Sequence, residues 1–443
     1  DNIGQALAGL LAPEHLATDP AGGESAVFTL RVLPRDGVAH KVQVGLNTLA
    51  QPQVFGPVVD VPTLTGFAGR LPDAVPGRSY LHDLGRIQVV ADPDPAMKAL
   101  HGKCLAISGG GLWRMDGPWS STRIPLRGQL ASGKPILEVD KISDFSFVDM
   151  CVRPAGSRIG DRRRMVGVFH RLAGMGEETY ICGMDPDGTV WPIAGSSQPL
   201  FKGSRLPLEG PGPSLFFSHL SRTALDASGN ILVVEPQQIR RIDPEGRVTL
   251  LAGGGDRVLV VEDGVGSHAR FGWISDFTLD AASGDLYVSD ENAIRRVRPD
   301  GAVTTVLGAL GVVPSVPVPP VPTRIAEGVP CLELPHGLAC QGGVLYICQP
   351  QNNQILAFNL WDRTLHTLLK ADLKEPLRLG CLPAFAREKA LADCANLPSP
   401  RQIVVAGRRV LVAADAGIMG GPVIVQFDLP HGVYGETERE RKD

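Results

Sequence analysis

The chain has 443 residues and a formal net charge of −4. This weakly acidic balance does not favour nucleic acid or an anionic membrane as a partner, and no apolar run approaches the roughly 18 residues that a membrane span needs. With 43% hydrophobic residues, 52 Gly and 37 Pro, the composition predicts many short strands joined by tight turns.

The first 52 residues are predicted to form an extension outside the main domain. Residues 3–17 carry a short helical pattern, and residues 27–34 and 40–46 are two β-rich runs around the turn Asp36-Gly37, which is typical of a hairpin. The chain opens at Asp1 with neither Met nor a signal-peptide pattern. We interpret the N-terminus as processed or truncated, so the sequence leaves the compartment unknown.

Residues 223–254 and 277–308 contain the same pattern twice. Each copy has an apolar strand, a Gly turn, a second apolar strand ending on an acid, a strand with paired Arg, an acid-Gly turn and a final β-branched strand. This is one four-stranded antiparallel unit, and its repetition is typical of a β-propeller.

Fainter copies of the last two strands recur along the chain. Outer strands end at Gly69, Gly128, Gly195, Gly254, Gly308 and Lys370, and third strands begin at Trp113, Cys182, Arg240, Arg295, Ala357 and Val425. The first outer strand, residues 62–69, has no third strand before it, and the last third strand has no outer strand after it, so the two must complete one sheet. The sequence therefore predicts an all-β fold, a six-bladed propeller over residues 53–430 that is closed by an N-terminal outer strand and followed by a charged tail, residues 431–443.

Three insertions distinguish the predicted blades. A basic loop, residues 156–167, carries Arg162, Arg163 and Arg164. An apolar Pro-rich run, residues 311–323, includes Val316, Val318 and Val321, and residues 383–396 have helical spacing. We expect the basic loop and the Pro-rich run to be partner-binding segments.

The two clear copies resemble NHL repeats, which occur in six-bladed propellers. The resemblance rests on the turn at residues 226–230, the strand-ending acids Glu235 and Asp290, and the Pro-x-Gly turns, with Ala269-Arg270-Phe271 before the second copy. It covers residues 216–308 well and the other blades less closely. NHL propellers include enzymes, RNA binders and protein scaffolds, so the resemblance implies the fold and leaves the function open.

Aligning the blades places one polar residue near the start of each inner strand. The residues Ile142-Ser143-Asp144-Phe145 match Ile274-Ser275-Asp276-Phe277. The set is Asp144, Arg222, Asp276, His336 and Gln402, with Asp83 or Gln88 in the first blade. Inner strands converge at the channel mouth, where this ring is expected to bind a small polar ligand or to satisfy itself through pairs such as Arg222 with Asp144 or Asp276.

Metal chemistry at this ring is a separate hypothesis. Pro335-His336-Gly337-Leu338 resembles one zinc-ligand site of amidating-lyase propellers, but the equivalent positions hold Arg222 and Asp276 instead of His. Gluconolactonase-like propellers use carboxylates around calcium or another divalent cation, and Asp144, Asp276 and His336 are the candidate ligands for such a site. No cofactor is predicted, because Arg222 opposes a cation electrostatically.

The remaining motifs have structural interpretations. The pairs Arg240-Arg241 and Arg295-Arg296 sit where the repeat favours Arg, so they are expected to make salt bridges between blades with the strand-ending acids rather than to bind RNA. The eight Cys contain no C-x-x-C motif and are expected to be mainly buried thiols, with Cys340–Cys348 and Cys381–Cys394 as alternative bridges.

The sequence thus favours a non-enzymatic propeller scaffold that binds a protein partner, as a subunit of a larger assembly. The rival is a channel-mouth hydrolase or lyase that depends on a metal, and the third hypothesis is an RNA-binding NHL domain.

Overall fold

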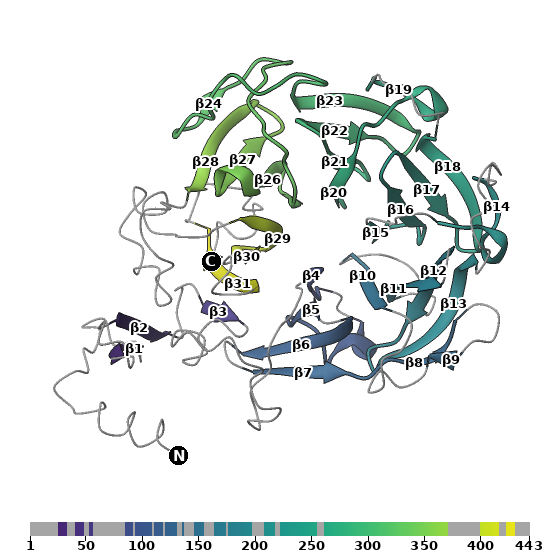
Figure 1. Cartoon of the computed structure of the whole chain (residues 1–443), viewed down its shortest axis with the longest axis horizontal. Helices are drawn as coiled ribbons and strands as arrows, with labels where there is room; N and C mark the ends of the chain where they lie inside the picture. Colours follow the sequence, from purple (N-terminus) through teal and green to yellow (C-terminus); the bar gives the residue numbers. More distant parts are fainter. Residues whose placement is uncertain are drawn as a thin grey trace.

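A computed structural model describes residues 25–32, 40–47, 53–55, 85–91, 94–108, 110–117, 120–130, 135–136, 146–154, 164–173, 176–196, 208–217, 222–254, 261–370, 399–415 and 422–429. The strands form an all-β propeller, which confirms the predicted fold class: the sheets surround a central channel that β4, β10, β15, β20 and β29 approach most closely (Figure 1). No helix in these ranges has the length and hydropathy of a membrane span.

The sheets are numbered here in chain order. Sheet 1 contains β4 (Ile87–Val89), β5 (Cys104–Ser108), β6 (Gly111–Gly117) and β7 (Ser120–Ile124). Sheet 2 contains β10 (Ser146–Val152), β11 (Met165–Ala173), β12 (Gly176–Met184) and β13 (Thr189–Ser196), with β8 (Arg127–Gln129) and β9 (Pro135–Ile136) added at its outer edge. Sheet 3 contains β15 (Arg222–Leu225), β16 (Ile231–Glu235), β17 (Gln238–Ile242) and β18 (Arg247–Gly253), with β14 (Gly210–Pro211).

The next three sheets complete the set. Sheet 4 contains β20 (Ile274–Leu279), β21 (Leu286–Asp290), β22 (Ala293–Val297) and β23 (Ala302–Gly308), with β19 (Gly264–Val265). Sheet 5 contains β25 (Leu338–Gln341), β26 (Val344–Gln349), β27 (Gln354–Asn359) and β28 (Thr364–Lys370), with β24 (Thr323–Arg324). Sheet 6 contains β29 (Pro400–Ala406), β30 (Arg409–Asp415), β31 (Pro422–Asp428) and β3 (Gln53–Phe55). Short 3₁₀ turns lie at η2 (Pro95–Met97), η4 (Gly212–Ser214), η5 (Gly266–His268) and η6 (Pro350–Asn352).

An N-terminal strand completes sheet 6, because β3 pairs with β31 in antiparallel register. The sequence placed this strand at residues 62–69, so the predicted segment was wrong: residues 53–55 occupy the edge, and 62–69 lie outside the described ranges. β1 (Ser25–Val32) and β2 (His40–Asn47) form the predicted antiparallel hairpin, which lies outside the ring (Figure 1). The predicted helices at 3–17 and 383–396 and the tail at 431–443 also fall outside the description.

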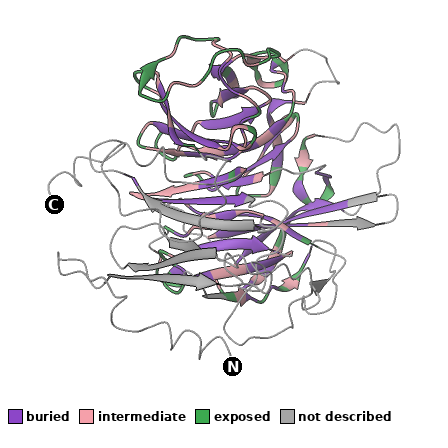
Figure 2. Ribbon diagram, turned by 60° about the vertical axis from the view of Figure 1, so that its left-hand side comes forward, coloured by how far each residue is buried: buried purple, intermediate pink, exposed green. Residues whose placement is uncertain are grey.

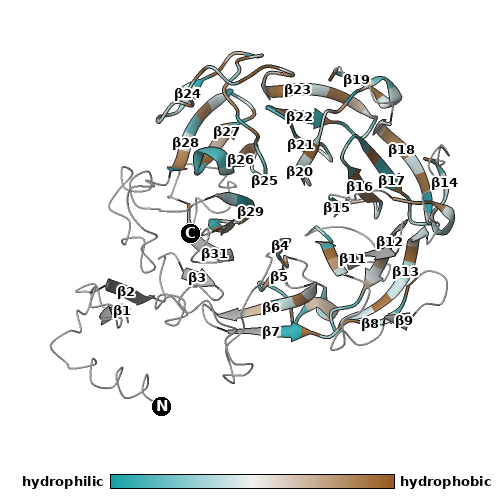
Figure 3. Ribbon diagram, in the orientation of Figure 1, coloured by the Kyte–Doolittle hydropathy of each residue, from teal (hydrophilic) through white to brown (hydrophobic). Residues whose placement is uncertain are grey.

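Hydrophobic clusters hold each sheet against the next. Val166 of sheet 2 packs with Ile231 of sheet 3, and Ala413 of sheet 6 belongs to one cluster with Ala106 of sheet 1. Equivalent clusters join the other neighbouring sheets. Figure 2 shows buried residues along the strands, and Figure 3 shows that hydrophobic residues recur even along outer strands such as β18 and β23. Apolar burial between sheets is therefore the main stabilising contribution to the ring.

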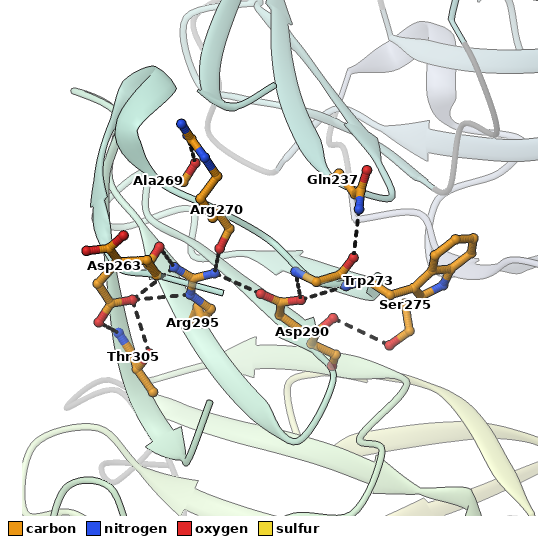
Figure 4. Close-up of polar contacts among 12 residues, drawn as sticks. Gln237, Asp263, Ala269, Arg270, Trp273, Ser275, Asp290, Arg295 and Thr305 are labelled. Carbon is orange, nitrogen blue, oxygen red and sulfur yellow. Dashed lines mark hydrogen bonds and ion pairs between the residues drawn. The ribbon is translucent and has the colours of Figure 1, made fainter. Parts of the chain in front are cut away.

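A buried Arg, an acid and a Phe form a knot within each of the two clear repeats. Arg240 Nε donates to Glu235 at 2.7 Å and lies over the Phe217 ring at 4.0 Å. Arg295 repeats this arrangement: it pairs with Asp290 at 2.8 Å (Figure 4). It also lies over the Phe271 ring at 4.7 Å. Both Arg are almost fully buried, where a guanidinium needs a carboxylate partner.

The knots confirm that these Arg pair with strand-ending acids, but the expected bridging between blades was wrong. Arg240 and Glu235 lie on one hairpin of sheet 3, and Arg295 and Asp290 lie on one hairpin of sheet 4. The Arg and the acid of each pair are five residues apart in sequence, on the two strands of one hairpin. Their side chains therefore meet within one sheet.

The six cysteines that the structure describes are free thiols, and five of them are buried. Burial raises the pKa of Cys104 to about 12 and that of Cys331 to about 11, so both stay protonated. This confirms buried thiols for this set, and Cys340 and Cys348 do not form the alternative bridge.

The segments before sheets 3 and 4 are each tied to their own sheet by a backbone bond to a turn glycine. Gly212 N donates to Gly246 O, and Gly266 N donates to Gly301 O, each at 2.9 Å. Gly301 has φ +85°, and a Cβ there would lie 2.5 Å from Leu251 O of the preceding sheet. The Pro-x-Gly turn therefore needs glycine both for its left-handed backbone and for the close approach of sheet 3.

We predict that Gly301→Ala lowers the free energy of unfolding by about 3 kcal/mol, because strain and a steric clash add. The matched control is Gly328→Ala, at φ +71° with no heavy atom within 4 Å of the added Cβ. Its cost should be only about 1 kcal/mol. Urea unfolding of both variants checks this, and equal losses would show that the contact with Leu251 is unimportant.

Candidate functional site: a charged ring in the central channel

One register position of the inner strands places polar side chains around the channel. In sheets 2, 4 and 6 it immediately follows a β-bulge, and in sheets 1, 3 and 5 it is identified by strand pairing and backbone bonds to the second strand. The six residues at this position, in sheet order, are Arg86, Asp149, Arg222, Asp276, Gly337 and Gln402. We call this set the channel ring.

The channel ring contains three of the predicted residues, namely Arg222, Asp276 and Gln402. Asp144 lies outside the described residues, and Asp149 instead stands at the sheet 2 position, so the predicted register of that blade was wrong. The tetrapeptide shared by residues 142–145 and 274–277 produced this error, because it does not reflect strand pairing.

The first and fifth positions were also predicted wrongly. In sheet 1 the position holds Arg86, whereas Gln88 lies two residues later and Asp83 lies outside the described residues. In sheet 5 it holds Gly337, since His336 N donates to Cys348 O and Cys348 N donates to Gly337 O. A Cβ at Gly337 would collide with the backbone of Arg401, so β29 leaves no room for a side chain there.

Asp276 is the centre of the ring. Its Oδ1 accepts from Arg222 Nε at 3.1 Å and from Arg86 Nη1 at 3.3 Å, and its side chain is almost fully buried. Arg222 comes from the neighbouring sheet 3, while Arg86 comes from sheet 1, across the channel. The expected self-pairing of Arg222 with Asp276 is therefore present, and a second guanidinium joins it.

The acceptor side chains of the ring bind the backbone of the next sheet. Asp149 Oδ2 accepts from Thr223 N at 2.6 Å and from its hydroxyl at 2.7 Å. Asp276 Oδ2 accepts from Leu338 N at 3.3 Å, and Gln402 Oε1 accepts from Ile87 N at 3.0 Å. Each donor follows the ring position of its own strand, so the ring fastens sheet 2 to 3, 4 to 5 and 6 to 1.

Asp149 keeps one buried oxygen, Oδ1, without a hydrogen-bond partner. Burial raises the pKa of this carboxyl group, and the charges of Arg86 and Arg222 act in the opposite direction. With Asp149 ionised, the two Asp and two Arg of the ring sum to zero charge, which offsets part of the cost of burying them.

His336 lies beside the ring rather than in it. Its Nδ1 is 3.0 Å from the Arg401 carbonyl oxygen, which can only accept, so Nδ1 carries the proton. Burial lowers the pKa of His336, with the Asp276 charge acting against this shift. Among the described residues, no group of three or more His, Cys, Asp or Glu is arranged to hold a metal ion.

A cavity of about 430 Å³ extends from the ring toward the ends of the inner strands. Arg86 and Asp276 line it at the ring, and Pro154, Gln341 and Gly407 line it near the strand ends. Most of the wall is apolar, including Phe277, Leu338 and Val404, which lie on three different sheets. The ring therefore lines one end of a cavity of small-molecule size.

Of the predicted basic loop, the structure describes Arg164. Its Nε donates to Asp94 Oδ2 at 2.8 Å, and Arg153 Nη2 donates to the same oxygen at 3.0 Å. Asp94 precedes η2 of sheet 1, and both Arg belong to sheet 2, so this cluster joins two sheets. Arg164 is thus paired within the chain, and Arg162 and Arg163 lie outside the described residues.

The predicted Pro-rich segment runs along sheets 4 and 5. Pro319 O accepts from Thr367 N of β28 at 2.9 Å, which anchors the segment to the outer strand. Val316 and Val321 are exposed, as the partner-binding hypothesis requires, but Val318 packs against the core of sheet 5. Val318 is therefore an anchoring residue.

No protein-family model matches the sequence, and a search of the curated proteins returns no match. A Bacteroides thetaiotaomicron protein of unknown function is similar in structure at 12% identity, with a TM-score of 0.46 and coverage of 93% of this chain and 89% of that one. A putative phosphatase from the same organism has 10% identity, a TM-score of 0.46 and coverages of 94% and 86%. A Xanthomonas campestris gluconolactonase has 14% identity, a TM-score of 0.34 and coverages of 82% and 100%. Similarities this distant carry no conclusion about function.

We predict that Asp276→Asn lowers the free energy of unfolding by about 3 kcal/mol, since two guanidinium groups lose their shared carboxylate. Arg222→Met should cost only about 1 kcal/mol, because Asp276 keeps Arg86. The double variant should lose less than the sum of the two. Chemical denaturation measures all three, and an Arg222→Met loss as large as that of Asp276→Asn would contradict this order.

The cluster at Asp94 predicts a pH dependence. The Ala96 backbone N–H, followed by the Arg164 side chain, lowers the pKa of Asp94 from 3.8 to about 2. Its stabilising contribution is complete above the ordinary pKa and is lost as the pH falls through the lower value. The Tm difference between the wild type and Asp94→Asn should therefore be constant from pH 7 to about 5, shrink as the pH falls further and vanish only below about pH 2. A difference that persists unchanged at pH 2 would show that the charge of Asp94 is not responsible.

Proposed function

We propose that this chain is a six-bladed, NHL-type propeller that acts as a non-enzymatic scaffold and binds a protein partner. One observation carries the proposal. Among the residues whose burial is described, the large exposed hydrophobic side chains all lie between Val265 and Trp361, on sheets 4 and 5 and the segments before and between them. Exposed apolar residues on a protein without a partner are usually scattered, so their concentration on one sector favours an interface.

The channel ring supports a structural role at the centre. The Asp276 carboxylate has two guanidinium neighbours, and Asp149 Oδ2 has two donors from Thr223. A divalent cation at Asp276 would have to displace Arg86 and Arg222 or face their charges. This arrangement disfavours the hydrolase or lyase hypothesis that uses Asp144, Asp276 and His336.

The RNA-binding hypothesis loses three of its candidate arginines for a similar reason. Arg240 and Arg295 are buried in the knots with Glu235 and Asp290, so they cannot reach a phosphate backbone without unfolding the hairpins. Arg164, from the basic loop, is paired with Asp94.

A small molecule in the channel cavity is a second candidate function. The observation that favours it is the size of the cavity, about 430 Å³, together with its mainly apolar wall. An uncharged ligand with an apolar body would fit this wall.

The test is the native mass of the untagged protein in an extract of its own source. The scaffold proposal predicts a stable species heavier than the 47.1 kDa chain, whose second component is identified and reconstituted from purified proteins. Asp276→Asn should enter this assembly at wild-type yield once its fold is verified. A species at the chain mass, with a metal-dependent hydrolysis that Asp276→Asn abolishes, would contradict the proposal.

A further inference from the structure

Four exposed hydrophobic residues are fixed around one short turn of sheet 4. The turn is Glu291-Asn292, between β21 and β22. The Asn292 side chain donates to Val312 O at 3.1 Å and accepts from Leu334 N at 3.0 Å, while Glu291 N donates to Trp273 O at 3.4 Å. Three chain segments that are distant in sequence are therefore bound to two adjacent residues.

The side chains at these points are open to solvent. The exposed fractions are 59% for Trp273, 46% for Val312, 79% for Val313 and 51% for Leu334. We call Trp273, Val312, Val313 and Leu334, together with the Glu291-Asn292 turn, the Asn292 patch. A large aromatic side chain among exposed aliphatic ones is the composition of an interface centre.

The backbone of the patch is held in an uncommon conformation. Leu334 has φ +40° and Glu291 has φ +51°, both in the left-handed region that branched or bulky residues rarely adopt. The bond from Leu334 N to Asn292 keeps an exposed leucine in this conformation. Such strain typically persists where the position of a side chain matters for function.

The buried knot of sheet 4 fixes the patch from beneath. Asp290 Oδ1 accepts from both Gly272 N and Trp273 N at 3.0 Å, and its Oδ2 accepts from Arg295. In Figure 4 the Trp273 ring points away from this carboxylate. The indole is thus presented by a rigid backbone, which reduces the entropy that binding would cost.

Two acidic residues are part of the same surface. Glu291 is half-buried in the turn itself, and Glu333 immediately precedes Leu334. Glu333 Oε2 accepts from the neutral Asn352 side chain at 3.1 Å. Neither Glu has an ion pair with any residue that the structure describes, so the rim of the patch carries uncompensated negative charge.

We propose that the Asn292 patch binds a segment of a partner protein in which apolar side chains stand next to Lys or Arg. The apolar residues would cover Trp273, Val313 and Leu334, and the basic residues would meet Glu291 and Glu333. This inference rests on the proposed scaffold function and names the contact surface and the chemistry of the partner.

The experiment is selection from a displayed library of random 12-residue peptides, followed by affinity measurement on purified full-length variants. The patch variant is Trp273→Ser/Val313→Ser/Leu334→Gly, in which glycine suits the left-handed backbone. The charge variant is Glu291→Gln/Glu333→Gln. The matched control is Trp361→Ser, an 82% exposed Trp beside Gly343, which lies beyond the opposite end of β25 from Leu334. Thermal unfolding establishes that each variant is folded.

The proposal predicts that selected peptides combine aromatic or aliphatic residues with Lys or Arg. Their affinity should fall at least about tenfold on the patch variant and about threefold on the charge variant, and should not change on Trp361→Ser. Added salt should weaken binding to the wild type more than binding to the charge variant.

Three outcomes would overturn the proposal: no enriched peptides, peptides rich in Asp or Glu, or peptides that bind the patch variant as well as the wild type. Self-association of the wild type that the patch variant abolishes would overturn it too, because the occupant would then be a second copy. None of these outcomes tests the scaffold function, which the native-mass experiment decides. If that experiment finds a heavier assembly, the interface of this chain lies outside the Asn292 patch. The scaffold function and the Asn292 patch are both rejected only if the native protein has the mass of the single chain and shows hydrolytic activity.

Discussion

The structure depends on the cancellation of charge where the inner strands of the sheets meet. One register position from every sheet faces the same narrow channel, so any ionised residue there must find its counter-charge among the other five. Arg86 and Arg222 meet on the Asp276 carboxylate, and Asp149 lies within reach of their charges. The same acceptors bind the backbone of the next sheet, so one layer of side chains both neutralises the channel and joins neighbouring sheets. Because Arg86 and Arg222 already neutralise the Asp276 carboxylate, the channel is poorly suited to bind a cation. We therefore expect the functional surface to lie outside the channel.

The outward surface is connected to the repeat itself. In sheet 4 the acid that ends the second strand pairs with the buried Arg295 and also holds the backbone of Trp273. In sheet 3 the equivalent acid, Glu235, pairs with Arg240 and with Gln238. The shared knot stabilises both blades, while the residues beyond it differ from blade to blade. The repeated residues thus supply a rigid frame, and the unrepeated linker segments, above all residues 311–334, supply exposed apolar side chains.

The fold was predictable because its signals are local: alternating strands, glycine turns and acid–Arg pairs recur at nearly constant spacing. The position of the ring was predictable only in part. Arg222, Asp276 and Gln402 were found by alignment, but Arg86, Asp149 and Gly337 were missed. For Asp149, a chance tetrapeptide at residues 142–145 and the β-bulge beside it shift the apparent register. For Arg86 and Gly337, nearby polar residues such as Gln88 and His336 were taken for the ring position. The sequence did contain a signal for the ring position of sheet 2. Asp149 is a charged residue directly before the strand-forming residues Met150-Cys151-Val152. The Asn292 patch had no such signal, since side-chain hydrogen bonds between segments 20 and 42 residues apart create it.

The most direct test of the account is hydrogen–deuterium exchange on the protein alone and in its native assembly. The account predicts slower exchange on assembly at residues 291–292, 312–316 and 334, and no change along the inner strands β20 and β25. These strands line the channel cavity, so protection confined to residues 276–279 and 338–341 would contradict the account and return the function to the channel.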